Sequence, residues 1–200
     1  LNATLGLAYI DAGQIDKADQ CLSKAEAGGT DTVDTRYLRG LVLYKQNKNP
    51  EALAAFDRVL ELDSRNLMAN YYRGQTLVRI GRNDAAVAAY KKSLEVDPKF
   101  TPASFELGVW YYNAGDYTSS ATSYENVIRY EPTNAQAHAN LASCYRQLGR
   151  YGDANAEYKI ASETIKTPEL YSEWGFCLGK TNEWDKSVAR LNTAREMSPT

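Results

Sequence analysis

Apolar residues recur at the spacing of an amphipathic helix through the stretch FELGVWYYNAGDY, residues 105–117. A β-strand would show strict alternation of apolar and polar positions instead. Gly115 follows the apolar run, and glycine readily adopts the left-handed conformation that ends a helix. The pattern therefore predicts one helix up to Gly115 and a second helix that begins at Asp116-Tyr117.

The same spacing recurs along the whole chain, which shows four sets of positions repeating every 34 residues with one interval of 33. A period shared by four sets argues against a strand pair or a unique active-site wall, because neither explains the repetition. The sets are the glycine set (Gly6, Gly40, Gly74, Gly108, Ala142, Gly175), the small set (Ala18, Ala52, Ala86, Ser120, Ala154, Ser187), the bulky set (Leu22, Phe56, Tyr90, Tyr124, Tyr158, Leu191) and the turn set (Gly13, Asn47, Gly81, Gly115, Gly149, Asn182).

Each set has a physical role in a pair of helices. The glycine set marks places where a facing helix comes too close for a side chain, since glycine within a helix otherwise costs about 1 kcal/mol. The small set lies opposite on the second helix, and the bulky set, four residues later, fills the gap. The turn set ends the first helix. Pro98, Pro132 and Pro199 stop the second helices.

This pattern resembles the tetratricopeptide repeat, a helix–turn–helix unit of about 34 residues. The resemblance implies an all-α fold, a right-handed superhelical solenoid of antiparallel helix pairs, forming one domain over residues 1–200. Because the chain begins at Leu1, without methionine and within a helical pattern, we expect it to be part of a longer protein. The six predicted repeats are 1–32, 33–66, 67–100, 101–134, 135–167 and 168–200.

Composition narrows the classes of partner. The chain has 23 basic and 25 acidic residues and a net charge of −2, so we expect no binding of nucleic acid. The longest apolar runs are too short to span a bilayer, so we expect no direct insertion into a membrane. Three cysteines without metal-ligand spacing fit a reducing compartment, which favours the cytoplasm.

No motif for catalysis is apparent. His138 is the single histidine, and no second candidate ligand recurs near it, which favours a packing role over a metal site. Cys144 and Cys177 occupy the same slot in neighbouring repeats, as small core residues would. Glycine-rich phosphate loops are absent. We therefore predict that the chain is not an enzyme and needs no metal or cofactor.

The resemblance implies that the first helices line a concave groove, facing it with positions 2, 5, 6, 9, 12 and 13 of each repeat. The alternatives are that the aromatic rings pack against neighbouring helices and that the basic residues complement helix dipoles. The fifth position carries an aromatic residue in three consecutive repeats, which suits an apolar ladder. The residues predicted to line the groove are Tyr37, Tyr71, Tyr72, Gln75, Arg79, Phe105, Tyr112, Asn140 and Arg146.

Two specialised grooves of this family do not match. No three consecutive repeats carry the lysines, asparagines and arginine of a carboxylate clamp. The sixth position carries asparagine only at Asn140, so an asparagine ladder is absent as well.

The sequence thus predicts a protein–protein interaction scaffold that binds a peptide segment or a partner protein and supports assembly of a multiprotein complex. One alternative is a regulatory or targeting arm of an enzyme whose catalytic domain lies outside this sequence. Another is a self-associating scaffold that forms homo-oligomers.

Overall fold

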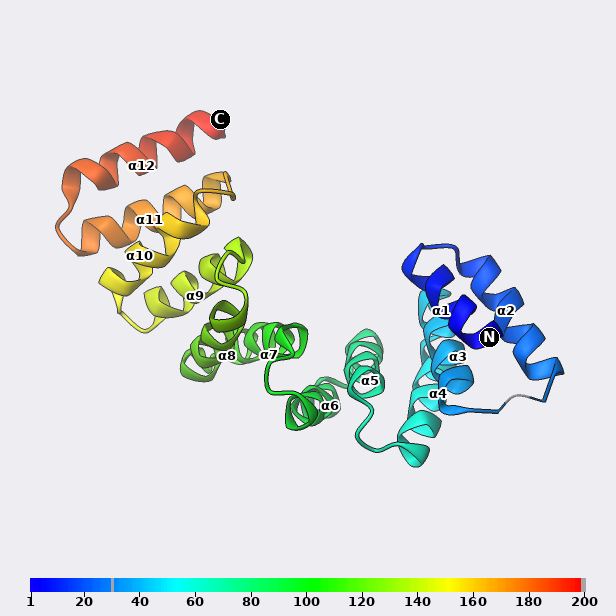
Figure 1. Ribbon diagram of the computed structural model, residues 1–200. Helices are drawn as coiled ribbons and strands as arrows, with labels where there is room; N and C mark the ends of the chain where they lie inside the picture. Colours follow the sequence, from blue (N-terminus) through cyan, green and yellow to red (C-terminus); the bar gives the residue numbers. More distant parts are fainter. Residues whose placement is uncertain (30, 199–200) are drawn as a thin grey trace. The chain divides into compact units, whose positions relative to one another are not determined.

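The computed structural model describes residues 1–29 and 31–198, and all of their regular secondary structure is α-helical (Figure 1). This confirms the prediction of an all-α solenoid of helix pairs. The first helices of the pairs are α1 (Asn2–Asp11), α3 (Val33–Lys45), α5 (Leu67–Arg79), α7 (Thr101–Asn113), α9 (Ala135–Gln147) and α11 (Pro168–Lys180). The second helices are α2 (Ile15–Ala27), α4 (Asn49–Leu62), α6 (Asn83–Val96), α8 (Tyr117–Tyr130), α10 (Tyr151–Ala161) and α12 (Trp184–Met197).

The chain divides into two compact units, residues 1–103 and residues 104–200, which we call the amino-terminal and the carboxyl-terminal unit. Within each unit the helices pack mainly against their neighbours in sequence, as α3 does against α4 and α11 against α12. Each predicted repeat contains one helix pair. That the two units form a single domain stays a prediction.

The turns between paired helices are left-handed, as predicted. Gly115 has a φ of +79°, and the two asparagines of the turn set, Asn47 and Asn182, have φ of +59° and +62°. Asparagine tolerates this region better than other residues with a side chain, because its short polar group can hydrogen-bond locally. The other glycines of the turn set also have positive φ (Gly13, Gly81 and Gly149).

Side-chain caps mark where helices begin. The side chain of Asn66 accepts a hydrogen bond from the Ala69 N–H at 3.0 Å, at the start of α5. Asp116 accepts from the Ser119 N–H at 3.1 Å, which confirms that α8 begins after Asp116. Such caps satisfy N–H groups that have no partner within the helix. Three more first helices are capped in the same way (Thr32, Asn134 and Thr167).

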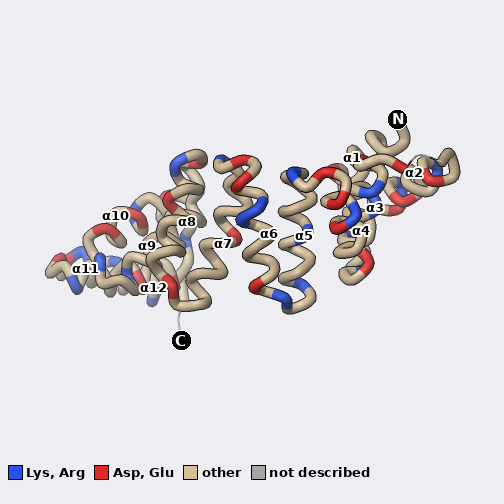
Figure 2. Tube along the Cα trace, turned by 90° about the horizontal axis from the view of Figure 1, so that it is seen from below, with Lys and Arg blue, Asp and Glu red and all other residues tan. Residues whose placement is uncertain are grey.

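Proline follows two of the second helices. α6 ends at Val96, before Pro98, and α8 ends at Tyr130, before Pro132, as predicted. The same prediction for Pro199 lies outside the described residues. Acidic and basic residues are interspersed along the helices of both units, which fits the balanced net charge (Figure 2).

An aromatic ring explains most of the glycine set. A Cβ added at Gly74 would lie 2.5 Å from Cε1 of Tyr90, and one at Gly108 would lie 2.7 Å from Cζ of Tyr124. The small set faces the same point, because the Ser120 hydroxyl donates to the Gly108 carbonyl at 2.7 Å. The close neighbour is thus the bulky-set side chain rather than the backbone of the facing helix, which corrects the sequence interpretation.

Gly6 is the exception in the glycine set. A Cβ at Gly6 would come closest to the Leu38 side chain of α3, the next first helix, and would lie 3.3 Å from Cβ of Cys21 on its own second helix. The small set continues elsewhere as predicted: the Ser187 hydroxyl donates to the Gly175 carbonyl at 2.7 Å, and Gly175 lies under Leu191.

Candidate functional site

The first helices of the amino-terminal unit present a group of half-buried aromatic side chains. The Tyr37 ring centroid lies 6.1 Å from that of Phe56 and 6.2 Å from that of Tyr72. The Tyr71 centroid lies 5.9 Å from that of Tyr90. Ring pairs at this distance add about 0.5–1.5 kcal/mol beyond the burial of their area. Both fifth-position rings therefore rest on bulky-set rings, and packing accounts for one side of each.

Gln75 and Arg79 are held by the same aromatic group. The Gln75 amide donates to the Tyr71 hydroxyl at 3.0 Å and accepts from the Tyr44 hydroxyl at 3.3 Å. The Arg79 guanidinium carbon lies 3.5 Å from the Tyr44 ring centroid, and Nη1 donates to the Tyr44 carbonyl at 2.8 Å. That carbonyl is at the end of α3, where helical carbonyls have no partner within the helix.

Tyr44 therefore contacts both Gln75 and Arg79 on this face, although the sequence analysis did not single it out. It occupies the twelfth position of its repeat, one of the positions expected to face the groove, and that position was the available signal. Tyr44 is 6% exposed, so its ring is largely covered by these neighbours.

The carboxyl-terminal unit contains a cavity on its first-helix face, between α7 and α9. Its volume is about 210 Å³. Phe105 lies beside it, because the Phe105 ring centroid is 5.5 Å from that of the lining residue Tyr124. The lining residues are Val109, Tyr112, Asn113, Tyr124, Asn140 and Ser143.

Neutral donors and acceptors dominate this cavity. The Asn140 side chain accepts from Gln136 Nε2 at 2.9 Å and is hydrogen-bonded to the Tyr124 hydroxyl. The Tyr112 hydroxyl accepts from Gln147 Nε2 at 3.4 Å. Burial raises the pKa of Tyr124 above its usual range, so its hydroxyl keeps its proton at neutral pH.

A partly exposed carboxylate occupies the corresponding place one repeat later, between α9 and α11. Tyr158 donates its hydroxyl hydrogen to Glu173 Oε2 at 2.6 Å, and Ser143 donates to the same oxygen at 3.1 Å. Arg146 Nη2 lies 3.3 Å from Glu173 Oε1. Arg146 is thus paired within the unit, and its predicted role toward a partner's acidic groups stays a prediction.

The two interfaces differ at the sixth position of the repeat. Asn140 and Glu173 both occupy it. Glu173 contacts Tyr158 and Arg146 of the preceding repeat, whereas Asn140 is hydrogen-bonded to Tyr124 and lines the cavity. The difference between asparagine and glutamate at this position can be read from the sequence. Which neighbours each side chain contacts depends on packing that the sequence pattern does not give.

The histidine and cysteines are structural in their surroundings. His138 is 4% exposed, with Nδ1 2.5 Å from a Glu157 carboxylate oxygen and Nε2 3.0 Å from the Pro132 carbonyl oxygen. Cys144 and Cys177 are fully buried. Burial raises the pKa of both thiols, that of Cys177 to about 11, which keeps them protonated and unreactive.

Within residues 1–29 and 31–198, no group of three or more histidine, cysteine, aspartate or glutamate side chains is arranged to hold a metal ion. None of the helices in this part of the chain is long and apolar enough to cross a membrane.

Solved structures of other proteins share this architecture. No curated protein matches the chain. A solved structure of YrrB, described as a TPR protein with an unusual peptide-binding site, is 18% identical, with a TM-score of 0.80 over 89% of this chain and 92% of that one. A structure of MamA is 20% identical, with a TM-score of 0.74 over 82% of this chain and 91% of that one. At these identities the likeness shows the fold alone.

The family model for the tetratricopeptide repeat matches residues 4–66, 37–104 and 105–163. These ranges together cover most of the chain and contain the helix pairs of four predicted repeats in full and most of a fifth. With the positive-φ turns and the ring-covered glycines of both units, they show that this chain belongs to the tetratricopeptide repeat family.

Proposed function

We propose that this chain is a protein-interaction scaffold and that the cavity between α7 and α9 receives one side chain of a bound peptide segment. The hollow at Asn140, next to the filled position at Glu173, carries this proposal. One repeat later, Glu173 at the equivalent position extends to Tyr158 and Arg146. A cavity lined by a few polar groups beside an apolar wall is a candidate for binding.

The size and chemistry of the cavity favour a peptide over a small-molecule ligand. Pockets for such ligands usually measure about 300–1,000 Å³, and this cavity measures about 210 Å³. Asn113 and Asn140 offer amide donors and acceptors, and Val109 offers an apolar wall. Backbone N–H and C=O groups of an extended segment need such neutral partners, and its side chain needs the apolar wall.

The structural neighbours support this function without extending it to a named partner. YrrB is described as peptide-binding, and its architecture is similar over most of this chain. The complex that this scaffold would help to assemble is part of the proposal. A catalytic role finds no support in the described residues, where the histidine and both carboxyl-terminal cysteines are buried in packing contacts.

Asn140→Glu tests the proposal, because it places at Asn140 the side chain that fills the corresponding space at Glu173. Peptides selected from a displayed library against the wild-type chain are synthesised, and their affinities are measured by fluorescence anisotropy. We expect Asn140→Glu to weaken binding by about tenfold or more, which corresponds to about 1.4 kcal/mol. The matched control is Asn192→Glu on α12, which should bind as the wild type does.

Circular dichroism establishes that both variants keep their helical content. If every selected peptide binds the Asn140→Glu and Asn192→Glu chains with equal affinity, the cavity is not the binding site and the proposal is wrong.

A further inference from the structure

A second pocket lies on the opposite side of the carboxyl-terminal unit, between the second helices α10 and α12. Its volume is about 370 Å³. Trp174 and Leu178 of α11 provide an apolar floor, and three basic residues line its walls. The lining residues are Asn155, Ala156, Lys159, Trp174, Leu178, Glu183, Lys186 and Arg190.

Two of the three cations have no carboxylate partner in the described part of the chain. Lys186 is paired with Glu183 at 2.6 Å, whereas Lys159 and Arg190 form no ion pair there. The Arg190 guanidinium carbon lies 4.2 Å from the Trp174 ring centroid. Stacking uses the face of the guanidinium, so its N–H groups, which lie in the plane, are left to bind an anion side-on.

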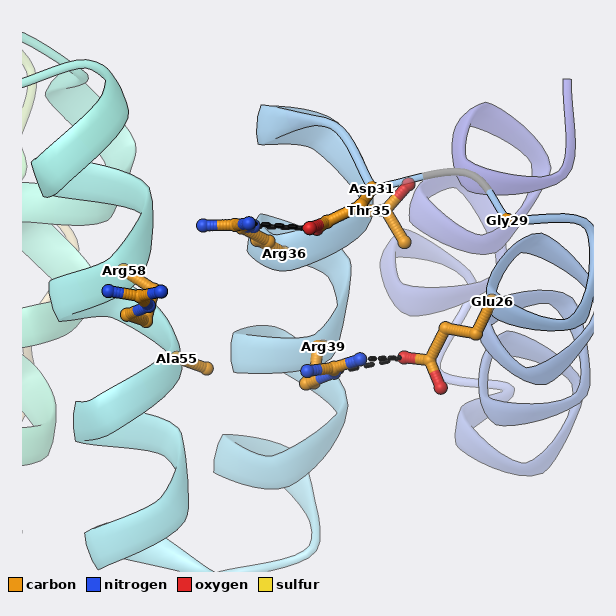
Figure 3. Close-up of a pocket in the computed structure, with 8 residues that line it drawn as sticks. All are labelled: Glu26, Gly29, Asp31, Thr35, Arg36, Arg39, Ala55 and Arg58. Atoms are coloured by element: carbon orange, nitrogen blue, oxygen red, sulfur yellow. Dashed lines mark hydrogen bonds and ion pairs between the residues drawn. The ribbon is translucent and has the colours of Figure 1, made fainter.

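The equivalent pocket of the amino-terminal unit binds carboxylates of the chain itself. In the pocket between α2 and α4, Arg36 Nε and Nη2 bind the Asp31 carboxylate at 2.6 and 2.5 Å (Figure 3). Arg39 Nη2 binds Glu26 at 2.6 Å in the same pocket (Figure 3). These arginines come from α3, the floor helix, and the chain's own acidic residues neutralise them.

Equivalent positions in the two units carry different residues at this groove. Arg73 pairs with Asp57 at 2.6 Å across the groove between α4 and α5. The equivalent positions near the end of the chain are Trp174 and Lys159. The carboxylate is thus replaced by a cation and the arginine by an indole, so this groove keeps an excess of positive charge; its one lining carboxylate, Glu183, is paired with Lys186.

The pocket wall also holds two buried polar atoms without a partner in the described residues. One is the indole nitrogen of Trp174, a side chain that is only 6% exposed, and the other is Asn155 Oδ1. A buried donor or acceptor left without a partner costs about 1–3 kcal/mol.

We propose that this pocket is a second binding site, which takes a glutamate or aspartate side chain of an acidic peptide segment. The edge of Arg190 binds the carboxylate side-on, and Lys159 supplies a second positive charge. Trp174 and Leu178 cover the aliphatic part of the acidic side chain. The site is independent of the cavity at Asn140, because no residue lines both.

The test uses a short fluorescein-labelled peptide in which glutamate alternates with serine, with an amidated carboxyl terminus, and a counterpart in which glutamine replaces glutamate. Fluorescence anisotropy measures the binding of each to the full chain. We expect the glutamate peptide alone to bind. Arg190→Gln and Lys159→Gln should each weaken binding by about tenfold or more, because hydrogen bonds to charged groups contribute about 1.5–3 kcal/mol.

Arg195→Gln is the matched control, since Arg195 is exposed on α12 outside the pocket and its loss changes the net charge equally. Lys159→Gln keeps the test decisive if loss of the stacking residue Arg190 disturbs the fold. Asn140→Glu should leave binding of the glutamate peptide unchanged.

Three results would overturn the proposal. The first is failure of the wild-type chain to bind the glutamate peptide. The second is an equal loss in the Arg195→Gln control, which would show a general effect of charge. The third is competition by inorganic phosphate at the same concentration as the glutamate peptide, which would assign the pocket to phosphate instead of a peptide carboxylate.

Discussion

Replacing Gly74 with leucine should destabilise the amino-terminal unit strongly, and the structure gives the reason. The new Cβ would lie 2.5 Å from Cε1 and 2.7 Å from Cδ1 of Tyr90. Carbon atoms of different groups pack at about 3.5–4.0 Å, so the ring must move by about 1 Å or more. Tyr90 is 2% exposed, so the ring has little free space to enter.

The expected loss in the free energy of unfolding lies between two limits. If the ring shifts and stays buried, overpacking costs about 1–3 kcal/mol. If the ring is expelled, the loss approaches the cost of removing a buried aromatic side chain, about 3–5 kcal/mol. Leucine recovers part of this, because it is a better helix former than glycine by nearly 1 kcal/mol. We expect a net loss of about 2–4 kcal/mol, or roughly 4–16 °C in Tm for a chain of this size.

Gly152→Leu is the matched control for this substitution. Gly152 lies within α10, and a Cβ there would meet no atom within 4 Å. The gain in helix propensity therefore has no packing cost to oppose it, and the control should melt at or slightly above the temperature of the wild type. Thermal unfolding followed by far-UV circular dichroism compares the three chains.

A double-mutant cycle identifies the ring as the cause. Tyr90→Ala should cost less in the Gly74→Leu chain than in the wild type, because it removes the clash together with the ring. Equal Tm values for Gly74→Leu and Gly152→Leu, or an additive cycle, would refute the reasoning that the ring makes glycine necessary.

Three further predictions follow from other parts of the structure. Gly115→Ala should lower stability by about 1–2 kcal/mol in thermal melts, because residue 115 has a φ of +79°, and an unchanged Tm would contradict this. Hydrogen bonds from Ser119 lower the pKa of the Asp116 carboxyl below 3.8, so its contribution to stability is present above pH 3.8 and is lost as the pH falls through the lowered pKa. An NMR titration that gives Asp116 a pKa of 3.8 or higher would contradict this prediction. Cys177, with a pKa of about 11, should resist iodoacetamide at neutral pH in the folded chain and react after unfolding, as mass spectrometry would show.

The helix pairs could be predicted from the sequence because the period constrains them many times over. Gly115 and its equivalents end six first helices at the same slot, and each was found in the left-handed region. The role of Gly74 was only partly predictable. A glycine at fixed spacing shows that something comes close, but which neighbour does so depends on the direction of the Tyr90 side chain.

The candidate sites depend more on side-chain length and direction than on spacing. Asn140 was predicted to face the groove, but spacing alone gave neither the cavity that it lines nor the contacts that Glu173 makes from the same position. Trp174 was not singled out at all, since it occupies a slot that carries arginine in earlier repeats. Its significance depends on Arg190, which lies far from it in sequence and above it in the fold.

Gly40, Gly74 and Gly108 are each covered by a ring from their own second helix, and this has a consequence for recombination between repeats. A crossover in the connection from one second helix to the next first helix keeps Gly74 with Tyr90, and Ala142 with Tyr158, in the same inherited segment. A crossover in the left-handed turn would instead join α9 to α6 and bring the Ala142 methyl under Tyr90. The unit that can be duplicated or exchanged without repacking is therefore the whole helix pair, and chimeric chains joined between pairs should fold where those joined within a pair do not.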